Sequence, residues 1–371
     1  MATGGYATYE DALNLARQHR ARGNLIAADR AYRDILESVG ETPDVLHEHG
    51  VTCYFRGAIQ EAYRQIKRAK ELEPETALYQ GNLAVMANML GRTEEAFAAW
   101  EAAIETDSTF VDAYSNFAKA LSRCGYPEAA EYYARQAVRL DPDHGDAAVN
   151  LGIARQAQGD LAGAVEIWED LHQRHGDHAT CASNLANAYR QYGRADDAEH
   201  MSAVALDLDP NNAIAHNNHA NNLLDKSKIH EAIEHFQRAV DLDPKYVTAY
   251  DNMGVALMAD DRPEEAVRWH RFALALDSEF AEAHQHLSVA LHQIGDLDGA
   301  ESAAKQAILL APDQLLYHIS LAEMLLTADR ADEAESVLNQ ALDLERDSAE
   351  TYRKLANALQ RLNRVEEAED A

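Results

Sequence analysis

Cysteine, proline and aromatic residues are scarce in this sequence of 371 residues. It contains 3 cysteines, 8 prolines and 7% aromatic residues, whereas 47% of its residues are hydrophobic. The cysteines, Cys53, Cys124 and Cys181, lie far apart without a CxxC pair, so neither a disulfide framework nor a zinc site is indicated. We expect three buried free thiols and a reducing compartment. An alanine-rich chain with few aromatic residues favours closely packed helices over a β-sandwich.

Basic residues and long apolar runs are also missing. Lys and Arg number 33 against 63 Asp and Glu, which gives a formal net charge of -30. This charge opposes binding to nucleic acid or to an anionic membrane surface and would attract a basic partner. No stretch approaches the roughly 18 apolar residues of a membrane span, and the start, MATGGYATYED, lacks the basic and apolar regions of a leader. We therefore expect a cytoplasmic protein that binds neither nucleic acid nor a membrane.

Alanine recurs along the chain at a constant interval. Eleven alanines are spaced 34 residues apart without an insertion or deletion: Ala28, Ala62, Ala96, Ala130, Ala164, Ala198, Ala232, Ala266, Ala300, Ala334 and Ala368. Self-similarity with a period of this size indicates a repeat architecture.

Further positions share the period. Twelve residues before each alanine stands a small residue, which is glycine at Gly50, Gly152 and Gly254. A turn residue, usually glycine, stands five residues before the alanine, and proline often follows twelve residues after it. Each 34-residue repeat is therefore predicted to contain a first helix, a turn, and a second helix that ends at the proline. The small residues let the two helices approach closely, and the hairpins must stack because one hairpin cannot bury its own apolar face.

The period and its signature sites resemble the tetratricopeptide repeat (TPR) family over essentially the whole chain. The resemblance implies an all-α protein: an α-solenoid of helix-turn-helix repeats that forms a right-handed superhelix, with first helices on the concave inside and second helices on the convex outside. Counted from Tyr9, ten full repeats occupy residues 9–348 and follow a flexible N-terminus, residues 1–8. Residues 349–371 form a partial eleventh repeat, which we expect to be truncated from a longer protein.

Asparagine occupies one first-helix position in six consecutive repeats, two residues before the small residue. These six residues are Asn82, Asn116, Asn150, Asn184, Asn218 and Asn252. The packing positions are already filled by small and apolar residues, so we expect helix packing not to require these amides. A carboxamide offers both a donor and acceptors, which match a peptide backbone. Amides on helix layers roughly 8–10 Å apart, about the span of three extended residues, predict a concave wall that holds an extended polypeptide.

The segment HNNHANN, residues 216–222, extends this polar surface. Its asparagines are three or four residues apart and form one strip on a helix, and Asn187 stands in the same way beside Asn184. We expect His216 and His219 to be hydrogen-bonded core histidines, because neighbouring repeats have apolar or aromatic residues there. The alternative for the asparagines is a polar surface that only keeps an open groove hydrated. The predicted peptide-binding residues are Asn82, Asn116, Asn150, Asn184, Asn187, Asn217, Asn218, Asn221 and Asn252.

Three segments carry a closer resemblance. AYSNFAKAL (113–121), ASNLANAYRQYG (182–193) and AIAHNNHANNLL (213–224) resemble the asparagine ladder of O-linked N-acetylglucosamine transferases and their bacterial relatives. In that family the TPR superhelix holds extended protein substrates for a glycosyltransferase domain. The resemblance carries the ladder role to the six recurrent asparagines. Repeats 2, 9 and 10 depart from the pattern, and in repeat 9 we expect more specific contacts from His284, Gln285, His286 and His292.

No catalytic motif is present. There is no P-loop, GxGxxG, GxSxG or HExxH, so the sequence predicts no enzyme activity, cofactor or metal for this chain. His172, His175 and His178 straddle a helix end and a turn, which does not suit three metal ligands. A chaperone-type clamp for a terminal carboxylate is also excluded, because it needs a lysine at the fifth position of the first helix and none of the repeats has one there.

The sequence therefore predicts a protein-binding module that recruits extended substrates for a bacterial O-glycosyltransferase. Two alternatives stay open. One is a scaffold that assembles a multiprotein complex, and the other is a TPR region attached to another enzyme, such as a sulfotransferase. A homodimer through convex or terminal repeats is a further open option.

Overall fold

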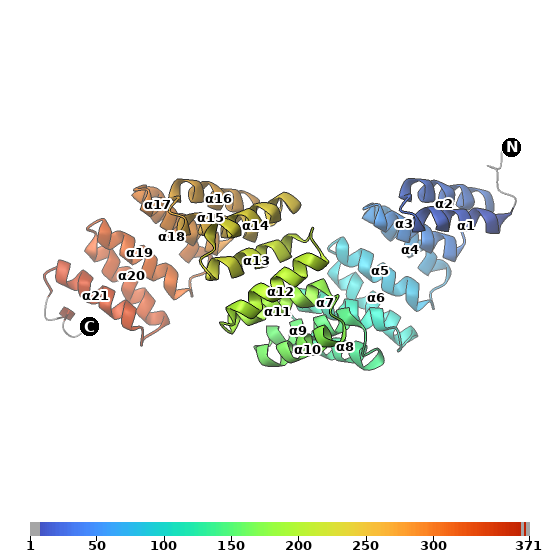
Figure 1. Cartoon of the computed structure of the whole chain (residues 1–371), viewed down its shortest axis with the longest axis horizontal. Helices are drawn as coiled ribbons and strands as arrows, with labels where there is room; N and C mark the ends of the chain where they lie inside the picture. The colour runs from blue at the N-terminus through green and yellow to red at the C-terminus, as the bar shows by residue number, and fades with distance from the viewer. Residues whose placement is uncertain (1–7, 365–366, 369–371) are drawn as a thin grey trace. The chain divides into compact units, whose positions relative to one another are not determined.

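The computed structural model of the chain describes residues 8–364 and 367–368. All elements in the described part are helices, numbered α1 to α21 in Figure 1, which confirms the predicted all-α fold. The chain divides into two compact units, unit 1 from Met1 to Gly176 and unit 2 from Asp177 to Ala371. Residues 1–7 of the predicted flexible N-terminus lie outside the described residues.

Unit 1 is a stack of five helical hairpins. Its first helices begin at 34-residue intervals, as the repeat predicts. The helices are α1 (Tyr9–Ala21), α2 (Leu25–Val39), α3 (Pro43–Phe55), α4 (Ile59–Leu72), α5 (Ala77–Met89), α6 (Thr93–Thr106), α7 (Val111–Arg123), α8 (Pro127–Leu140), α9 (Gly145–Ala157) and α10 (Leu161–Arg174).

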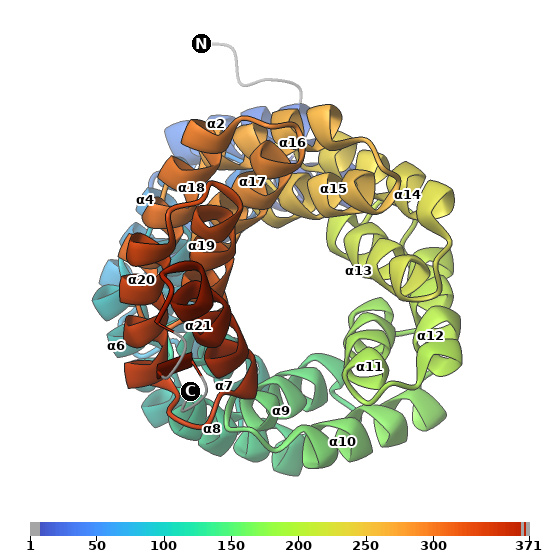
Figure 2. The same ribbon diagram turned by 90° about the vertical axis from the view of Figure 1, so that its left-hand side faces the viewer.

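Unit 2 continues the pattern with five hairpins and one further first helix. Its helices are α11 (Ala179–Gln191), α12 (Ala195–Leu208), α13 (Ala213–Asp225), α14 (Ile229–Leu242), α15 (Val247–Ala259), α16 (Pro263–Leu276), α17 (Ala281–Gln293), α18 (Leu297–Leu310), α19 (Leu315–Thr327), α20 (Ala331–Leu344) and α21 (Ala349–Arg361). In Figure 2 the first helices α11, α13, α15, α17 and α19 lie on the inner side of this curved stack, and the second helices lie outside them.

The turn inside each hairpin requires a left-handed residue. Seven repeats use glycine there, as at Gly57 (φ 77°) and Gly193 (φ 69°). The other four use Ser227, Asp261, Asp329 and Asn363, with φ between 57° and 59°. A left-handed backbone costs most residues energy, and short polar side chains tolerate it better than branched ones. The turn geometry is therefore constant although the glycine is not.

The periodic small residues lie where the helices of a hairpin touch. The second-helix alanines from Ala28 to Ala334 are all 0% exposed. A Cβ atom on Gly152 would lie 2.2 Å from Nε1 of Trp168, a buried side chain of the same hairpin. Gly50 and Gly254 face Ile66 and His270 in the same way. At these three positions the side chain of the opposite helix occupies the space that a Cβ atom would need.

Candidate functional site

The predicted ladder asparagines all lie on first helices. Unit 1 carries Asn82, Asn116 and Asn150 on α5, α7 and α9. Unit 2 carries the other three on α11, α13 and α15. Because α11, α13 and α15 line the inner side of unit 2, its three ladder residues belong to the inner helix layer (Figure 2).

Most of these amides form hydrogen bonds with the preceding repeat, always 35 residues earlier. In unit 1, Nδ2 of Asn82 lies 2.7 Å from Nε2 of His47. Nδ2 of Asn150 donates to the carbonyl oxygen of Ser115 at 3.0 Å and to its hydroxyl at 3.1 Å.

The same bond recurs in unit 2. Nδ2 of Asn218 donates to the hydroxyl of Ser183 at 3.0 Å, and Nδ2 of Asn252 donates to Oδ1 of Asn217 at 2.9 Å. A residue at the ladder position therefore faces the residue that precedes the ladder position in the repeat before it.

The repeats that lack asparagine keep a bond at this position. His286 contacts Asp251, and Ser320 accepts from Gln285, again across 35 residues. Glu48 pairs with Arg17, whose Nε lies 2.9 Å from Oε1 of the carboxylate. The ladder position is thus a general point of contact between consecutive first helices.

We expected helix packing not to require amides here, yet four of the six amides contribute hydrogen bonds between repeats. Each bond joins adjacent repeats and contributes about 1 kcal/mol to stacking. Stacking offsets neighbouring first helices, so that the ladder position of one repeat meets the residue before the ladder position of the preceding repeat. The sequence of a single helix does not reveal this offset. The bonds also fix the direction in which each amide points. In each of them the NH2 group of the ladder asparagine donates, and its oxygen takes no part.

Four predicted residues are not tied in this way. Asn116 is exposed, and Asn184, Asn187 and Asn221 are partly exposed. Among the described residues, none of the four side chains forms a hydrogen bond that joins it to a neighbouring helix, and Nδ2 of Asn184 is buried without a partner. Asn150 differs from them, because it is only 5% exposed. The predicted site residues therefore include both structural and accessible amides.

The histidines of HNNHANN are hydrogen-bonded, as predicted, but both are only partly buried and are not core residues. Nδ1 of His219 lies 2.7 Å from the hydroxyl of Ser202, and Nδ1 of His216 lies 3.0 Å from Nδ1 of His235. Burial lowers the pKa of His219, and the nearby His235 lowers it further, to about 4. In the same segment, Asn222 is buried and donates to the carbonyl oxygen of Ala198 at 3.0 Å. This asparagine joins α13 to α12 of the preceding repeat and is unavailable to a ligand.

Unit 1 has a polar hollow on its first-helix face. A cavity of about 540 Å³ lies over the first helices α1, α3 and α5. Its lining includes His47, the partner of Asn82, and the ion-paired Arg17 and Glu48. The complete lining is Arg17, Arg20, Asp44, His47, Glu48, Val51, Glu73, Thr76, Leu78 and Tyr79. The amide surface thus adjoins a hollow that a polypeptide could enter.

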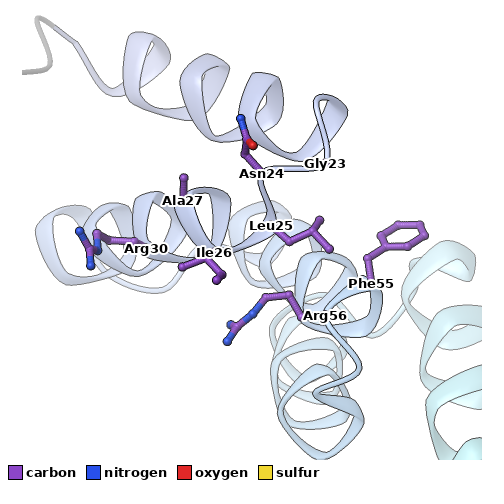
Figure 3. A pocket seen from close by; sticks show the side chains of 8 residues that line it. All are labelled: Gly23, Asn24, Leu25, Ile26, Ala27, Arg30, Phe55 and Arg56. Carbon is purple, nitrogen blue, oxygen red and sulfur yellow. The ribbon is translucent and has the colours of Figure 1, made fainter.

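A larger hollow of about 880 Å³ lies elsewhere in unit 1. Figure 3 shows its lining, which comes from the α1–α2 turn, the start of α2 and the end of α3: Gly23, Asn24, Leu25, Ile26, Ala27, Arg30, Phe55 and Arg56. Ile26 is 74% exposed and Phe55 is 61% exposed, so the surface is largely apolar. It contains no ladder residue.

Two clusters of ionisable residues were not foreseen. In unit 1, Asp29 contacts His49, Arg33 and Arg56. In unit 2, Asp251 contacts His270 and His286. Burial raises the pKa of Asp251, but the hydrogen bonds from both histidines outweigh burial and bring the pKa to about 2. Burial lowers the pKa of His286, but the bond to Asp251 and its charge outweigh this, so the pKa is raised.

The unit 1 cluster joins α2 to α3, and the unit 2 cluster joins α15, α16 and α17, which no local motif reveals. The available signal was an ionisable residue at a position that other repeats fill with an apolar one. Of the histidines expected to make specific contacts in repeat 9, His292 lies 2.9 Å from the hydroxyl of Thr327 and His284 bonds only to the Ser278 carbonyl oxygen. The groups in the described part of the chain that could hold a metal include none of His172, His175 and His178.

The cysteines differ from expectation in one respect. Cys53 and Cys181 are buried, and burial raises the pKa of each thiol to about 12. Cys124 is exposed at the end of α7, because the C-cap of a first helix leaves the core. The prediction of three buried thiols was therefore wrong for Cys124.

The described residues form stacked helical hairpins with a polar first-helix face, which defines an α-solenoid. Residues 120–180, 178–208, 281–314 and 315–340 match models described as the tetratricopeptide repeat, and residues 220–261 match a model described as the TPR repeat. The chain is therefore built of tetratricopeptide repeats. None of the five models describes a catalytic domain.

Solved structures support the fold. The APC/C hetero-tetramer Cut9–Hcn1 is similar with a TM-score of 0.64 at 15% identity, over 95% of this chain and 76% of that one. A human IFIT1 dimer with m7Gppp-AAAA gives 0.61 at 16% identity, over 99% and 89%. A tetratricopeptide repeat protein from Parabacteroides merdae gives 0.58 at 14% identity, over 67% and 98%. No curated protein matches the sequence.

None of the described helices is both long enough and apolar enough to span a membrane.

Proposed function

We propose that the first-helix face binds extended polypeptide through its amides. The observation that carries the proposal is the bond from the ladder position to the repeat before it. Asn82 and Asn252 are partly exposed and held by their NH2 groups, so each oxygen has a fixed orientation and can accept a bond without the entropy cost of ordering the side chain. A row of oriented oxygens suits the N–H groups of an extended backbone.

The accessible amides complete the binding surface. Asn116, Asn187 and Asn221 supply both donors and acceptors, because no neighbouring helix engages them in the described part of the chain. Three ladder rungs in one unit, roughly 8–10 Å apart, match about nine extended residues. The contacts are with the backbone, so binding depends weakly on the side chains of the ligand.

The test uses a fluorescein-labelled peptide of about 20 residues, rich in Ser, Thr and Pro, with no stable structure of its own. Its anisotropy is followed as the full chain is added. The triple variant N116A/N187A/N221A removes three accessible amides without breaking a bond between repeats. At about 1 kcal/mol for each lost hydrogen bond, the affinity falls at least tenfold.

A matched control lies on a second helix. Tyr132 on α8 is 59% exposed, and Tyr132→Ala leaves binding unchanged if the first-helix face is the site. A second probe with the same side chains but N-methylated backbone amides binds more weakly. The proposal fails if the triple variant binds like the wild type, or if only Tyr132→Ala weakens binding. The latter result favours a scaffold that uses its outer face.

We further propose that the bound polypeptide is a substrate of a bacterial O-glycosyltransferase, on the strength of the ladder pattern in residues 113–121, 182–193 and 213–224. The gene sequence beyond the codon for Ala371 tests this. A nucleotide-sugar-dependent transferase domain is expected. A sulfotransferase domain, or no domain, contradicts the proposal and favours one of the two alternatives.

A protein ligand in the cytoplasm is proposed over nucleic acid because of the net charge of -30. The fold alone does not decide this, since the similar IFIT1 structure is a dimer with m7Gppp-AAAA. An oligoadenylate competitor leaves peptide anisotropy unchanged if the proposal holds. Displacement of the peptide by the oligonucleotide contradicts it.

A further inference from the structure

Three ionisable side chains meet in unit 2 where two repeats join. Asp251 comes from α15, His270 from α16 and His286 from α17. Nδ1 of His270 lies 2.6 Å from Oδ1 of Asp251, and Nδ1 of His286 lies 2.8 Å from Oδ2. One potential ligand atom from each residue lies within 4.8 Å of the others.

This combination is confined to one place in the array. The position of His270 is filled in other repeats by core residues such as Trp168 and Phe236. The position of His286 is asparagine in seven repeats, and the position of Asp251 is serine or valine in several. Ordinary stacking therefore does not require an aspartate and two histidines here.

The backbone makes room for the cluster. Gly254 faces the ring of His270, and a Cβ atom at this glycine would lie 2.4 Å from Cε1 of the imidazole. His270 is 0% exposed and Asp251 is 2% exposed. The side chain of His286 is 40% exposed, so the cluster is open to solvent on one side only.

The charges favour a cation. A buried carboxylate needs a compensating positive charge, because its isolated ion is strongly destabilised away from water. Among the described residues, no lysine or arginine forms an ion pair with Asp251, and both of its oxygens face imidazole nitrogens. Metal ligation requires both imidazoles in the neutral form, and with the carboxylate the three side chains then carry a net charge of about -1.

We propose that Asp251, His270 and His286 bind a divalent transition metal ion of the Zn²⁺ class. Imidazole nitrogen and carboxylate oxygen are ligands that Zn²⁺, Co²⁺ and Ni²⁺ accept, and three protein ligands leave at least one position open. The open position faces the solvent side at His286 and holds water or a side chain of a bound polypeptide. Ligation at Nδ1 places the ring proton of each histidine on Nε2.

The second cluster, in unit 1, does not support the same inference. Asp29, His49, Cys53 and Glu61 also offer close ligand atoms. However, Arg56 lies 2.7 Å from Asp29, and Arg33 pairs with both Asp29 and Glu61. The two guanidinium groups already supply the positive charge and would repel a metal ion.

The test is a titration of the untagged full chain with Zn²⁺ by calorimetry and with Co²⁺ by visible absorption. One equivalent binds, and Co²⁺ gives the d–d absorption of a site with nitrogen ligands. His286→Asn installs the residue that seven repeats have at this position, so the variant folds. Loss of one ligand weakens binding at least about 100-fold, the upper end of what loss of a second-shell partner costs.

Two further variants make the result decisive. D251S/H286N recreates the hydrogen-bonded pair of Ser183 and Asn218, so its repeats stack, and it loses the one-equivalent site. His49→Leu, the residue at the equivalent position 83, retains the site. The proposal is overturned if the wild type binds no Zn²⁺ or Co²⁺, if His286→Asn binds equally well, or if His49→Leu abolishes binding.

Discussion

Replacing Gly152 by alanine tests why glycine stands at the small-residue position of this first helix, where most repeats have alanine. Gly152 lies in the middle of α9, opposite the fully buried Trp168 of α10. An added Cβ would lie 2.2 Å from Nε1, 2.4 Å from Cε2 and 2.9 Å from Cζ2 of the indole. The indole also donates to the carbonyl oxygen of Val149 at 3.3 Å. The ring must therefore move and weaken this hydrogen bond.

The magnitude follows from three contributions. Overpacking of a core costs about 1–3 kcal/mol, and loss of the indole hydrogen bond costs about 1 kcal/mol. Alanine regains about 1 kcal/mol, because glycine is a poor helix former. The net effect of Gly152→Ala is a loss of about 1–3 kcal/mol. In a chain that already carries Trp168→Ala the clash is gone, so the same substitution stabilises by up to about 1 kcal/mol.

The assay is hydrogen exchange at the α9 and α10 amides, supported by urea unfolding. Local exchange is preferable, because a repeat array does not unfold in a single two-state step. The double variant G152A/W168A is a suitable control, since Ala118 and Ala134 form the equivalent pair one repeat earlier. If Gly152→Ala is as stable as the wild type, or equally costly in both backgrounds, the contact with the indole does not explain the glycine.

Three further predictions concern stability and reactivity. Acidification from about pH 6.5 to pH 4 destabilises unit 2, because the pKa of His219 is about 4 when folded and near 6.5 when unfolded, so only the unfolded state gains the proton. This proton changes the free energy of unfolding by at most about 1.4 kcal/mol per pH unit. Urea unfolding at several pH values measures this dependence, which is smaller in the His219→Leu variant. An unchanged pH dependence in the variant contradicts the role given to His219. Asn150→Ala lowers the free energy of unfolding by about 1–3 kcal/mol, because it breaks two buried hydrogen bonds. Asn116→Ala changes it by less than about 0.5 kcal/mol, because this side chain is exposed. Equal urea midpoints for the two variants would argue against this difference. A thiol reagent at neutral pH modifies only Cys124 in the folded chain, measured as one thiol per molecule, and rapid modification of a second thiol would show that the burial of the other two is incomplete.

The position of the helices was predictable because the period is strict. The alanine interval of 34 residues placed every hairpin, and the structure confirms that the second-helix alanines from Ala28 to Ala334 are buried. Helix periodicity and close approach at small residues are local properties, so one sequence contains them. The location of the ladder asparagines on first helices was predictable for the same reason.

The use of those asparagines was not predictable in the same way. Asn150 is buried against Ser115 whereas Asn116 is exposed, although both occupy the ladder position. The difference depends on which side chain the preceding repeat places opposite the amide, and this requires the offset between stacked helices. The partition between amides that hold repeats together and amides that face solvent is thus a tertiary property.

The sequence by itself determined the repeat, the helices, and the residues on each first-helix face, because these depend on spacing along one chain. The tertiary structure decided which polar groups pair across repeats, and it brought Asp251, His270 and His286 together from three helices. Each of these pairings depends on distances between helices, which stacking sets and which no periodicity within a single helix encodes.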